Sequence, residues 1–182
     1  MKTIGYRNCI RIFLAVLLLS VSSCTSSQSR RDKSKEEDIT LDKIIEYNRR
    51  MVDVEQKVIG KYVEDNKLNM QATKTGLWYI LHENGKGDKI VKGQIVTLNY
   101  KISLLDGTVC YSSANDGQKV FQVGKGGVES GLEEGILMLR KGSKATFIMP
   151  PHLAHGLVGD DDRIPSRAIL KYDVEVVNVG EK

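Results

Sequence analysis

Glycine and proline are confined almost entirely to the second half of this chain. Of the 17 glycines only Gly5 and Gly60 precede residue 76, and all three prolines lie at residue 150 or later. Because these two residue types interrupt regular structure and form turns, the first half is predicted to be helical or unstructured and the second half rich in turns. A length of 182 residues suits one globular domain with appended segments.

The amino terminus has the pattern of a secretory signal. Basic residues precede an apolar run at residues 12–19, which is too short to span a bilayer because a span needs about 20 residues. Small residues directly before Cys24 resemble the lipobox of bacterial lipoproteins. We therefore expect residues 1–23 to be a lipoprotein signal peptide and Cys24 to be acylated. Ordinary cleavage beside an incidental cysteine is the alternative.

The net charge of +4 depends on that signal, which contains three of the basic residues. Without them the chain is close to neutral, and no basic stripe with interleaved aromatics is present, so a nucleic-acid partner is not expected. If Cys24 carries lipid, Cys110 is left without an intramolecular partner for a disulfide.

Residues 24–38 are Ser-rich and charged, and they are interpreted as the lipid anchor with a flexible tether. An amphipathic helix is predicted over residues 39–67, with Thr40 as its cap. Its apolar residues recur at spacings of three and four, the heptad signature: Ile44, Tyr47, Met51, Val54 and Val58. Three roles stay open for this helix: self-association into a homodimer through residues 40–66, packing on its own domain, or a spacer.

The second half is predicted to be α+β, a twisted antiparallel sheet wrapped on one short α-helix. Apolar and polar residues alternate strictly between residues 95 and 105, and again between 170 and 176, as in strands with one solvated face. Asp106-Gly107 predicts a hairpin after the first of these. Other strand candidates are residues 77–81, 108–111, 120–123 and 144–149. A surface turn is predicted at residues 83–88.

One helix is predicted to interrupt these strands between residues 130 and 139. Ser130 and Glu133 have the spacing of a capping box, and Gly142 follows the last basic residues. The usual catalytic motifs of hydrolases, zinc proteases and nucleotide-binding loops are missing. His152 and His155 with the Asp160–Asp162 run make only a weak metal pattern, so no metal and no other cofactor are expected.

Residues 75–180 resemble the FKBP-type peptidyl-prolyl cis-trans isomerase domain. The resemblance rests on several strings in order, of which the clearest are Phe121-Gln122-Val123-Gly124, Gly131-Leu132-Glu133-Glu134-Gly135 and Ile164-Pro165. Lipobox, charged tether, long helix and carboxy-terminal domain together resemble the lipid-anchored envelope FKBPs of Gram-negative bacteria. This implies a location in the bacterial cell envelope, with the domain in the periplasm.

The resemblance also implies a substrate pocket, carried over position by position: Tyr100, Cys110, Tyr111, Phe121, Val128, Glu129, Leu132, His155, Ile164 and Tyr172. Several positions depart from the family pattern. Cys110 replaces a Phe, Tyr111 an Asp, Leu132 the Trp of the pocket floor, and His155 a Tyr. Glu129 replaces an aliphatic residue whose backbone N–H the family uses.

The implied function is peptidyl-prolyl isomerisation with a folding-assistant role on proline-containing clients in the envelope, through an apolar cleft that needs no cofactor. Because several aromatic and polar groups of the family pocket are replaced, the activity is expected to be weakened. The alternative is a non-catalytic chaperone or protein-binding module on the same scaffold.

Overall fold

The computed structural model describes the backbone of residues 25–181 and the side chains of residues 40–181. The predicted signal peptide and Cys24 therefore lie outside the described residues. The chain divides into two compact units with the boundary between Arg50 and Met51, and the second unit contains the whole sheet. Among the described helices, none combines the length and the apolar character that crossing a membrane requires.

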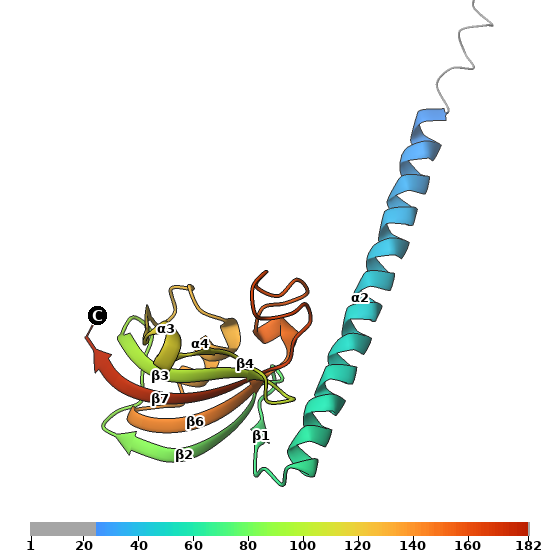
Figure 1. Cartoon of the computed structure of the whole chain (residues 1–182). Helices are drawn as coiled ribbons and strands as arrows, with labels where there is room; N and C mark the ends of the chain where they lie inside the picture. Colours follow the sequence, from blue (N-terminus) through green and yellow to red (C-terminus); the bar gives the residue numbers. More distant parts are fainter. Residues whose placement is uncertain (1–24, 182) are drawn as a thin grey trace, which may run out of the picture. The chain divides into compact units, whose positions relative to one another are not determined.

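Helix α2 runs from Thr25 to Asp65 (Figure 1). It begins earlier than predicted, so the segment interpreted as a flexible tether is helical, and Thr40 lies inside the helix instead of capping it. Residues 30–37 are rich in Arg, Lys and Glu. These residues have high intrinsic helix propensity, so the charged composition that indicated a tether is equally compatible with a solvated helix.

The end of α2 is a Schellman motif. Lys67 adopts a left-handed φ of 53°. The Lys67 N–H donates to the Glu64 carbonyl at 3.0 Å, and the Leu68 N–H donates to the Val63 carbonyl at 2.9 Å. Leu68 also packs against the apolar cluster that contains Val63, which is the hydrophobic contact typical of this motif. The helix thus ends at a defined residue and the chain turns into the sheet.

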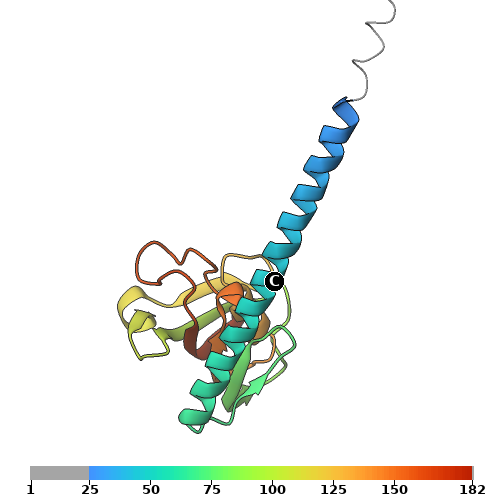
Figure 2. The same ribbon diagram turned by 90° about the vertical axis from the view of Figure 1, so that its right-hand side faces the viewer.

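The last turns of α2 pack on the domain. Ile59 and Val63 are buried together with Ile148 of the sheet, and Trp78 packs against them. The Trp78 indole N–H donates to Gln56 Oε1 at 2.8 Å. Packing on its own domain is therefore the role of this part of the helix (Figure 2).

A seven-stranded antiparallel sheet forms the second unit, in the order β1-β2-β6-β7-β3-β4, with β5 paired to β3 (Figure 1). The strands are β1 (Gln71–Ala72), β2 (Trp78–Lys86), β3 (Ile95–Leu104), β4 (Val109–Ser112), β5 (Lys119–Gln122), β6 (Lys141–Met149) and β7 (Leu170–Gly180). The helical segments are α3 (Ser113–Asp116), α4 (Ser130–Ile136) and the 3₁₀ turn η1 (Pro151–Leu153). The predicted α+β class is confirmed, and α3 is an additional turn.

Strand β2 is longer than predicted, because it continues through the segment 83–88 as far as Lys86, which pairs with Lys141. Gly85 has a φ of 70°, and a Cβ at this position would lie 2.4 Å from the Lys141 carbonyl oxygen. The glycine that suggested a surface turn therefore allows two backbones to approach closely.

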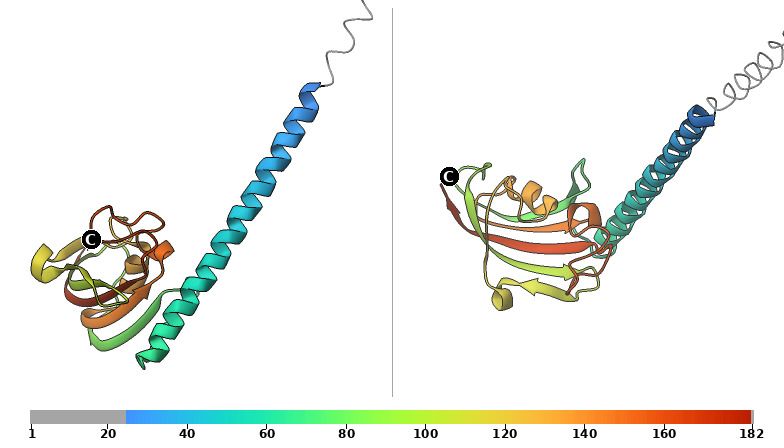
Figure 3. Two further views of the ribbon diagram at one scale, coloured as in Figure 1. Left: turned by 45° about the vertical axis from the view of Figure 1, so that its right-hand side comes forward. Right: turned by 90° about the horizontal axis from the view of Figure 1, so that it is seen from above.

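Helix α4 lies across the concave side of the curved sheet (Figure 3). Leu132 and Ile136 of α4 are buried with Phe147 of β6 and Tyr172 of β7 in the main core. Phe147 and Tyr172 are also direct partners in the β6–β7 register. The alternation seen in the sequence places these side chains on the covered face, opposite the face that α2 contacts.

The amino-terminal cap of α4 differs from the prediction. Ser130 and Glu133 form no capping box, and the cap residue is Glu129. A Glu133 carboxylate oxygen instead accepts a hydrogen bond from the Gly124 N–H at 2.6 Å, and the Ser130 hydroxyl donates to the Leu153 carbonyl at 3.4 Å. Both side chains thus bond to neighbouring segments that the local sequence cannot foresee.

Candidate functional site

The ten residues predicted to line a pocket are gathered around one cluster. Five are buried in the main core: Cys110, Phe121, Leu132, Ile164 and Tyr172. Three are half-buried against it: Tyr100, Tyr111 and Val128. Glu129 and His155 are joined to the cluster by hydrogen bonds. Leu132 is only 1% exposed, so it is a core residue at the position predicted to be the pocket floor.

Strands β3 and β7 place Tyr100 and Tyr172 on the covered face of the sheet. Tyr172 is fully buried, and its hydroxyl donates to Glu129 Oε1 at 2.5 Å. Burial and the neighbouring carboxylate raise the pKa of Tyr172, so the phenol stays protonated and can act as this donor. The ring therefore supplies an apolar wall, and its hydroxyl fixes the position of Glu129.

Glu129 is a buried carboxylate, with a side chain that is 9% exposed. Burial raises its pKa, but Lys119, the Tyr172 hydroxyl and the backbone N–H of Glu129 itself outweigh burial, and the pKa lies below its ordinary value. The carboxylate is thus ionised at neutral pH. His155 Nε2 lies 3.0 Å from Oε1, and because an ionised carboxylate only accepts, this nitrogen is the donor.

Lys119 of β5 lies beside these tyrosines and Glu129. The sequence analysis did not predict it as a site residue. Its Nζ lies 3.5 Å from Glu129 Oε2, 5.4 Å from the centre of the Tyr100 ring and 6.0 Å from that of Tyr172. The signal that could have found it is the two-residue spacing to Phe121, which puts both side chains on one face of the strand. We call Tyr100, Lys119, Glu129, His155 and Tyr172 the Tyr172 site.

A cavity of about 440 Å³ is lined by Val128, the residue that precedes Glu129 in the chain. Leu137 and the glycine-rich connection between β5 and α4 form further parts of its wall, and two acidic side chains, Glu133 and Glu134, lie at its border. Space for a ligand therefore exists beside Val128, which packs against the main core.

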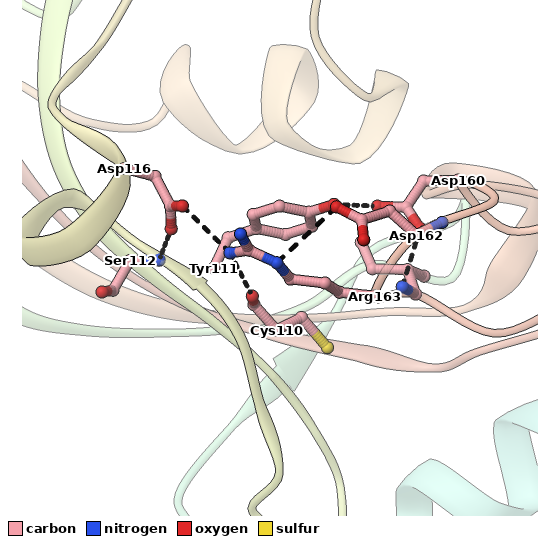
Figure 4. A network of polar contacts seen from close by, with 8 residues as sticks. Cys110, Tyr111, Ser112, Asp116, Asp160, Asp162 and Arg163 are labelled. Atoms are coloured by element: carbon pink, nitrogen blue, oxygen red, sulfur yellow. Dashed lines mark hydrogen bonds and ion pairs between the residues drawn. The ribbon is translucent and has the colours of Figure 1, made fainter.

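Beside the site, the loop after η1 is tied to β4 by a polar network (Figure 4). The Tyr111 hydroxyl donates to Asp160 at 2.5 Å and to Asp162 at 3.2 Å. Arg163 lies over the Tyr111 ring at 4.6 Å and donates to the Cys110 carbonyl at 3.2 Å and to Asp116 at 2.9 Å. Tyr111, predicted as a pocket residue, thus serves here as an anchor for the loop.

Asp160 organises the same loop through the hydrogen bonds that its carboxylate accepts. Partial burial raises its pKa, but hydrogen bonds from the Tyr111 hydroxyl and from the backbone N–H groups of Ile164, Asp162 and Arg163 outweigh it and lower the pKa to about 2. In the part of the chain that the structure describes, no cluster of three or more His, Cys, Asp or Glu side chains is arranged to hold a metal ion.

The depressed pKa predicts a pH-dependent contribution of Asp160 to stability. The contribution is present above the ordinary value of 3.8 and is lost as the pH falls toward about 2. Asp160→Asn should therefore lower the melting temperature at pH 7, and the difference from the wild type should shrink below pH 4. Melting curves from pH 2 to 7 measure this, with exposed Asp161→Asn as the matched control. A difference independent of pH would contradict it.

Comparison with known proteins agrees with this architecture. A family model described as FKBP-type peptidyl-prolyl cis-trans isomerase matches residues 86–177. The protein named probable FKBP-type peptidyl-prolyl cis-trans isomerase FkpA of Neisseria meningitidis is 38% identical over 115 residues, which are 63% of this chain and 42% of that protein. A probable isomerase of Haemophilus influenzae is 36% identical over 115 residues, or 63% of this chain and 47% of that protein.

Solved structures show the same fold. The crystal structure of AtFKBP13 has a TM-score of 0.57 and 31% identity, and the match covers 60% of this chain and 98% of that one. The crystal structure of FkpA from Escherichia coli has a TM-score of 0.62 at 24% identity, over 97% of this chain and 83% of that one. This chain spans less than half the length of the two curated relatives from Neisseria and Haemophilus.

Proposed function

We propose, because the chain belongs to the family of FKBP-type peptidyl-prolyl cis-trans isomerases, that this protein accelerates the cis–trans isomerisation of Xaa-Pro bonds in client polypeptides. The observation that carries the proposal is the cluster of apolar and aromatic side chains around Tyr172 that the fold assembles from β3, β5, β7 and α4. The proposed reaction uses this cluster and no cofactor.

The chemistry follows from the bond. Rotation about a prolyl amide meets a barrier of about 18–20 kcal/mol and is slow in water. The twisted transition state has lost amide resonance and part of its charge separation, so an apolar surrounding favours it over the planar, hydrated ground state. Phe121 is buried in the main core, Tyr100 and Val128 pack against it, and Val128 also lines the cavity.

The activity is proposed to be weak. Glu129 and Lys119 place opposite charges inside the aromatic cluster, and the Glu129 backbone N–H lies close to its own carboxylate. The two charges make the cluster less apolar. The Glu129 backbone N–H, being close to its own carboxylate, is less available to donate to a substrate carbonyl. The same features favour the second candidate, a non-catalytic protein-binding module or chaperone, over a fully active isomerase.

Exchange spectroscopy by NMR on an Ala-Leu-Pro-Phe peptide tests the two candidates, together with the refolding rate of a proline-limited protein. We expect this protein to accelerate both reactions, but by a smaller factor than a relative that carries the full aromatic set. If both assays give only the uncatalysed rate while the protein still suppresses aggregation of a client, the isomerase candidate fails and the binding-module candidate takes its place.

The location proposed is the bacterial cell envelope, with a lipid at Cys24 and the domain in the periplasm. The support is the short apolar run followed directly by the lipobox-like string. Cys24→Ala should leave an uncleaved precursor or a soluble protein, whereas Cys9→Ala should not. Membrane fractionation and mass spectrometry check this, since two or more acyl chains anchor a protein stably. A mature Cys24→Ala protein whose mass differs from the wild type only by the substitution itself would rule out the lipid.

A homodimer through residues 40–66 is the last part of the proposal. Along α2 the heptad residues Ile44, Tyr47, Val54 and Val58 are 50%, 53%, 50% and 46% exposed, while Ile59 packs on the domain. The stripe that remains exposed is thus separate from the one that the domain covers. A second helix of the same kind would bury it with knobs-into-holes packing.

Aspartate at Tyr47 and Val54 together is expected to convert the dimer to monomers, because it places charges in the apolar seam. Aspartate at Arg49 together with lysine at Asp53, two exposed positions away from the heptad seam, is the control and should leave the dimer intact. Sedimentation analysis gives both masses. A monomeric wild type would leave the exposed stripe without this partner.

A further inference from the structure

The Tyr172 site contains the parts of a cation-binding cage. Two aromatic rings, Tyr100 and Tyr172, face one ammonium group at 5.4 and 6.0 Å, and the buried carboxylate of Glu129 lies 3.5 Å from the same group. Aromatic faces and a desolvated carboxylate are the groups that bind alkylammonium and guanidinium ions. In this structure the ammonium group of the protein's own Lys119 occupies the cage.

The walls of this cage are fixed more firmly than its occupant. Glu129 is held by the Tyr172 hydroxyl and by His155, its side chain is only 9% exposed, and Tyr172 is fully buried. Lys119 is 24% exposed and reaches the cage on a flexible four-carbon stem from β5, a strand that pairs with β3. Its ammonium can therefore leave toward solvent while the walls stay in place.

An empty cage is unfavourable, because Glu129 would then be a buried charge without a cation. Its Oε2 atom already lacks a hydrogen-bond partner and depends on Lys119 for compensation. Two cations in the cage at once would repel each other. The cage thus holds one cation at a time, and any ligand that displaces Lys119 is favoured if it brings a positive charge of its own.

The surrounding charges favour the same kind of ligand. Asp116, Asp160 and Asp162 lie beside Tyr111 at the edge of the cluster, and Arg163 is the basic side chain that pairs with them (Figure 4). Among these side chains, with Glu129 and Lys119 included, four are acidic and two are basic. This excess attracts basic peptides and repels acidic ones.

We propose that Lys119 is an internal stand-in for a substrate cation, and that the site selects Xaa-Pro bonds with a lysine or arginine next to the proline. The inference rests on the proposed isomerase function and adds its specificity. The basic side chain of the substrate takes the place of Lys119 between the two rings and Glu129, while the proline lies against the neighbouring apolar residues. Lys119 and Glu129 are then the residues that determine specificity.

The experiment compares peptides that carry lysine or the uncharged isostere norleucine, either before or after the proline, using NMR exchange rates. The wild type is expected to accelerate the better-placed lysine peptide about threefold more than its norleucine counterpart. Lys119→Met removes the internal competitor and should raise this ratio to about tenfold, whereas Glu129→Gln should bring it close to one. Lys144→Met, which removes a surface pair with Glu83, is the control and should leave the ratio at the wild-type value.

Equal lysine-to-norleucine ratios in the wild type, Lys119→Met and Glu129→Gln would overturn the cage while leaving the isomerase function intact. If no variant accelerates any peptide, the isomerase function fails, and peptide dissociation constants in Lys119→Met decide the cage separately. Tighter binding of the lysine peptide would keep the cage as a binding site for basic segments. Equal dissociation constants for the lysine and norleucine peptides would rule out the cation-binding cage.

Discussion

Alanine at Gly135 is expected to destabilise the domain by about 1–3 kcal/mol, the usual effect of overpacking a core. A Cβ there would lie 2.7 to 3.0 Å from three atoms of the Phe147 ring, at the point where α4 packs on β6. Because Phe147 is itself fully buried, the ring has little room to move. The helix must then shift away from the sheet and carry Leu132 and Glu129 with it, so isomerase activity should fall as well.

Gly60→Ala is the matched control, since Gly60 also lies in a helix but a Cβ there would meet only Trp78 at 4.0 Å. Helix propensity alone then stabilises the variant by up to about 1 kcal/mol. Urea denaturation of the two variants measures both effects. Equal midpoints for Gly135→Ala and the wild type would show that the Phe147 ring moves aside without strain.

Tyr172→Ala is expected to lower the free energy of unfolding by about 3–5 kcal/mol, as for other large aromatic residues removed from a core. Tyr172 is fully buried and packs in the main cluster, and its hydroxyl is a hydrogen-bond donor to the buried Glu129. The variant therefore loses core packing and also weakens the compensation of a buried charge. Whatever isomerase activity the protein has should fall toward the uncatalysed rate.

Tyr172→Phe separates these two contributions, because it keeps the ring and removes only the hydroxyl. Loss of a hydrogen bond to an ionised group predicts a smaller destabilisation of about 1.5–3 kcal/mol. Chemical denaturation at a pH where Glu129 is ionised gives both values. If phenylalanine and alanine were equally destabilising, the hydroxyl and not the ring would hold the site together.

Features that depend on near neighbours in the chain were predictable from the sequence. Alternation between residues 95 and 105 and between 170 and 176 predicted β3 and β7, since side chains of a strand point to opposite faces in turn. The heptad spacing predicted α2, and Asp106-Gly107 predicted the turn into β4. The resemblance to the family supplied ten pocket positions, which the fold does gather around one cluster.

Contacts between distant segments were decided only by the tertiary structure. The Tyr172 site joins Lys119 of β5, Glu129 before α4, His155 after η1 and Tyr172 of β7, and no local period connects these positions. For the same reason Glu133 bonds to Gly124 instead of forming a capping box. Local periodicity determines which face of an element is buried, but the partner of a buried charge depends on which other segments the fold brings within a few ångströms.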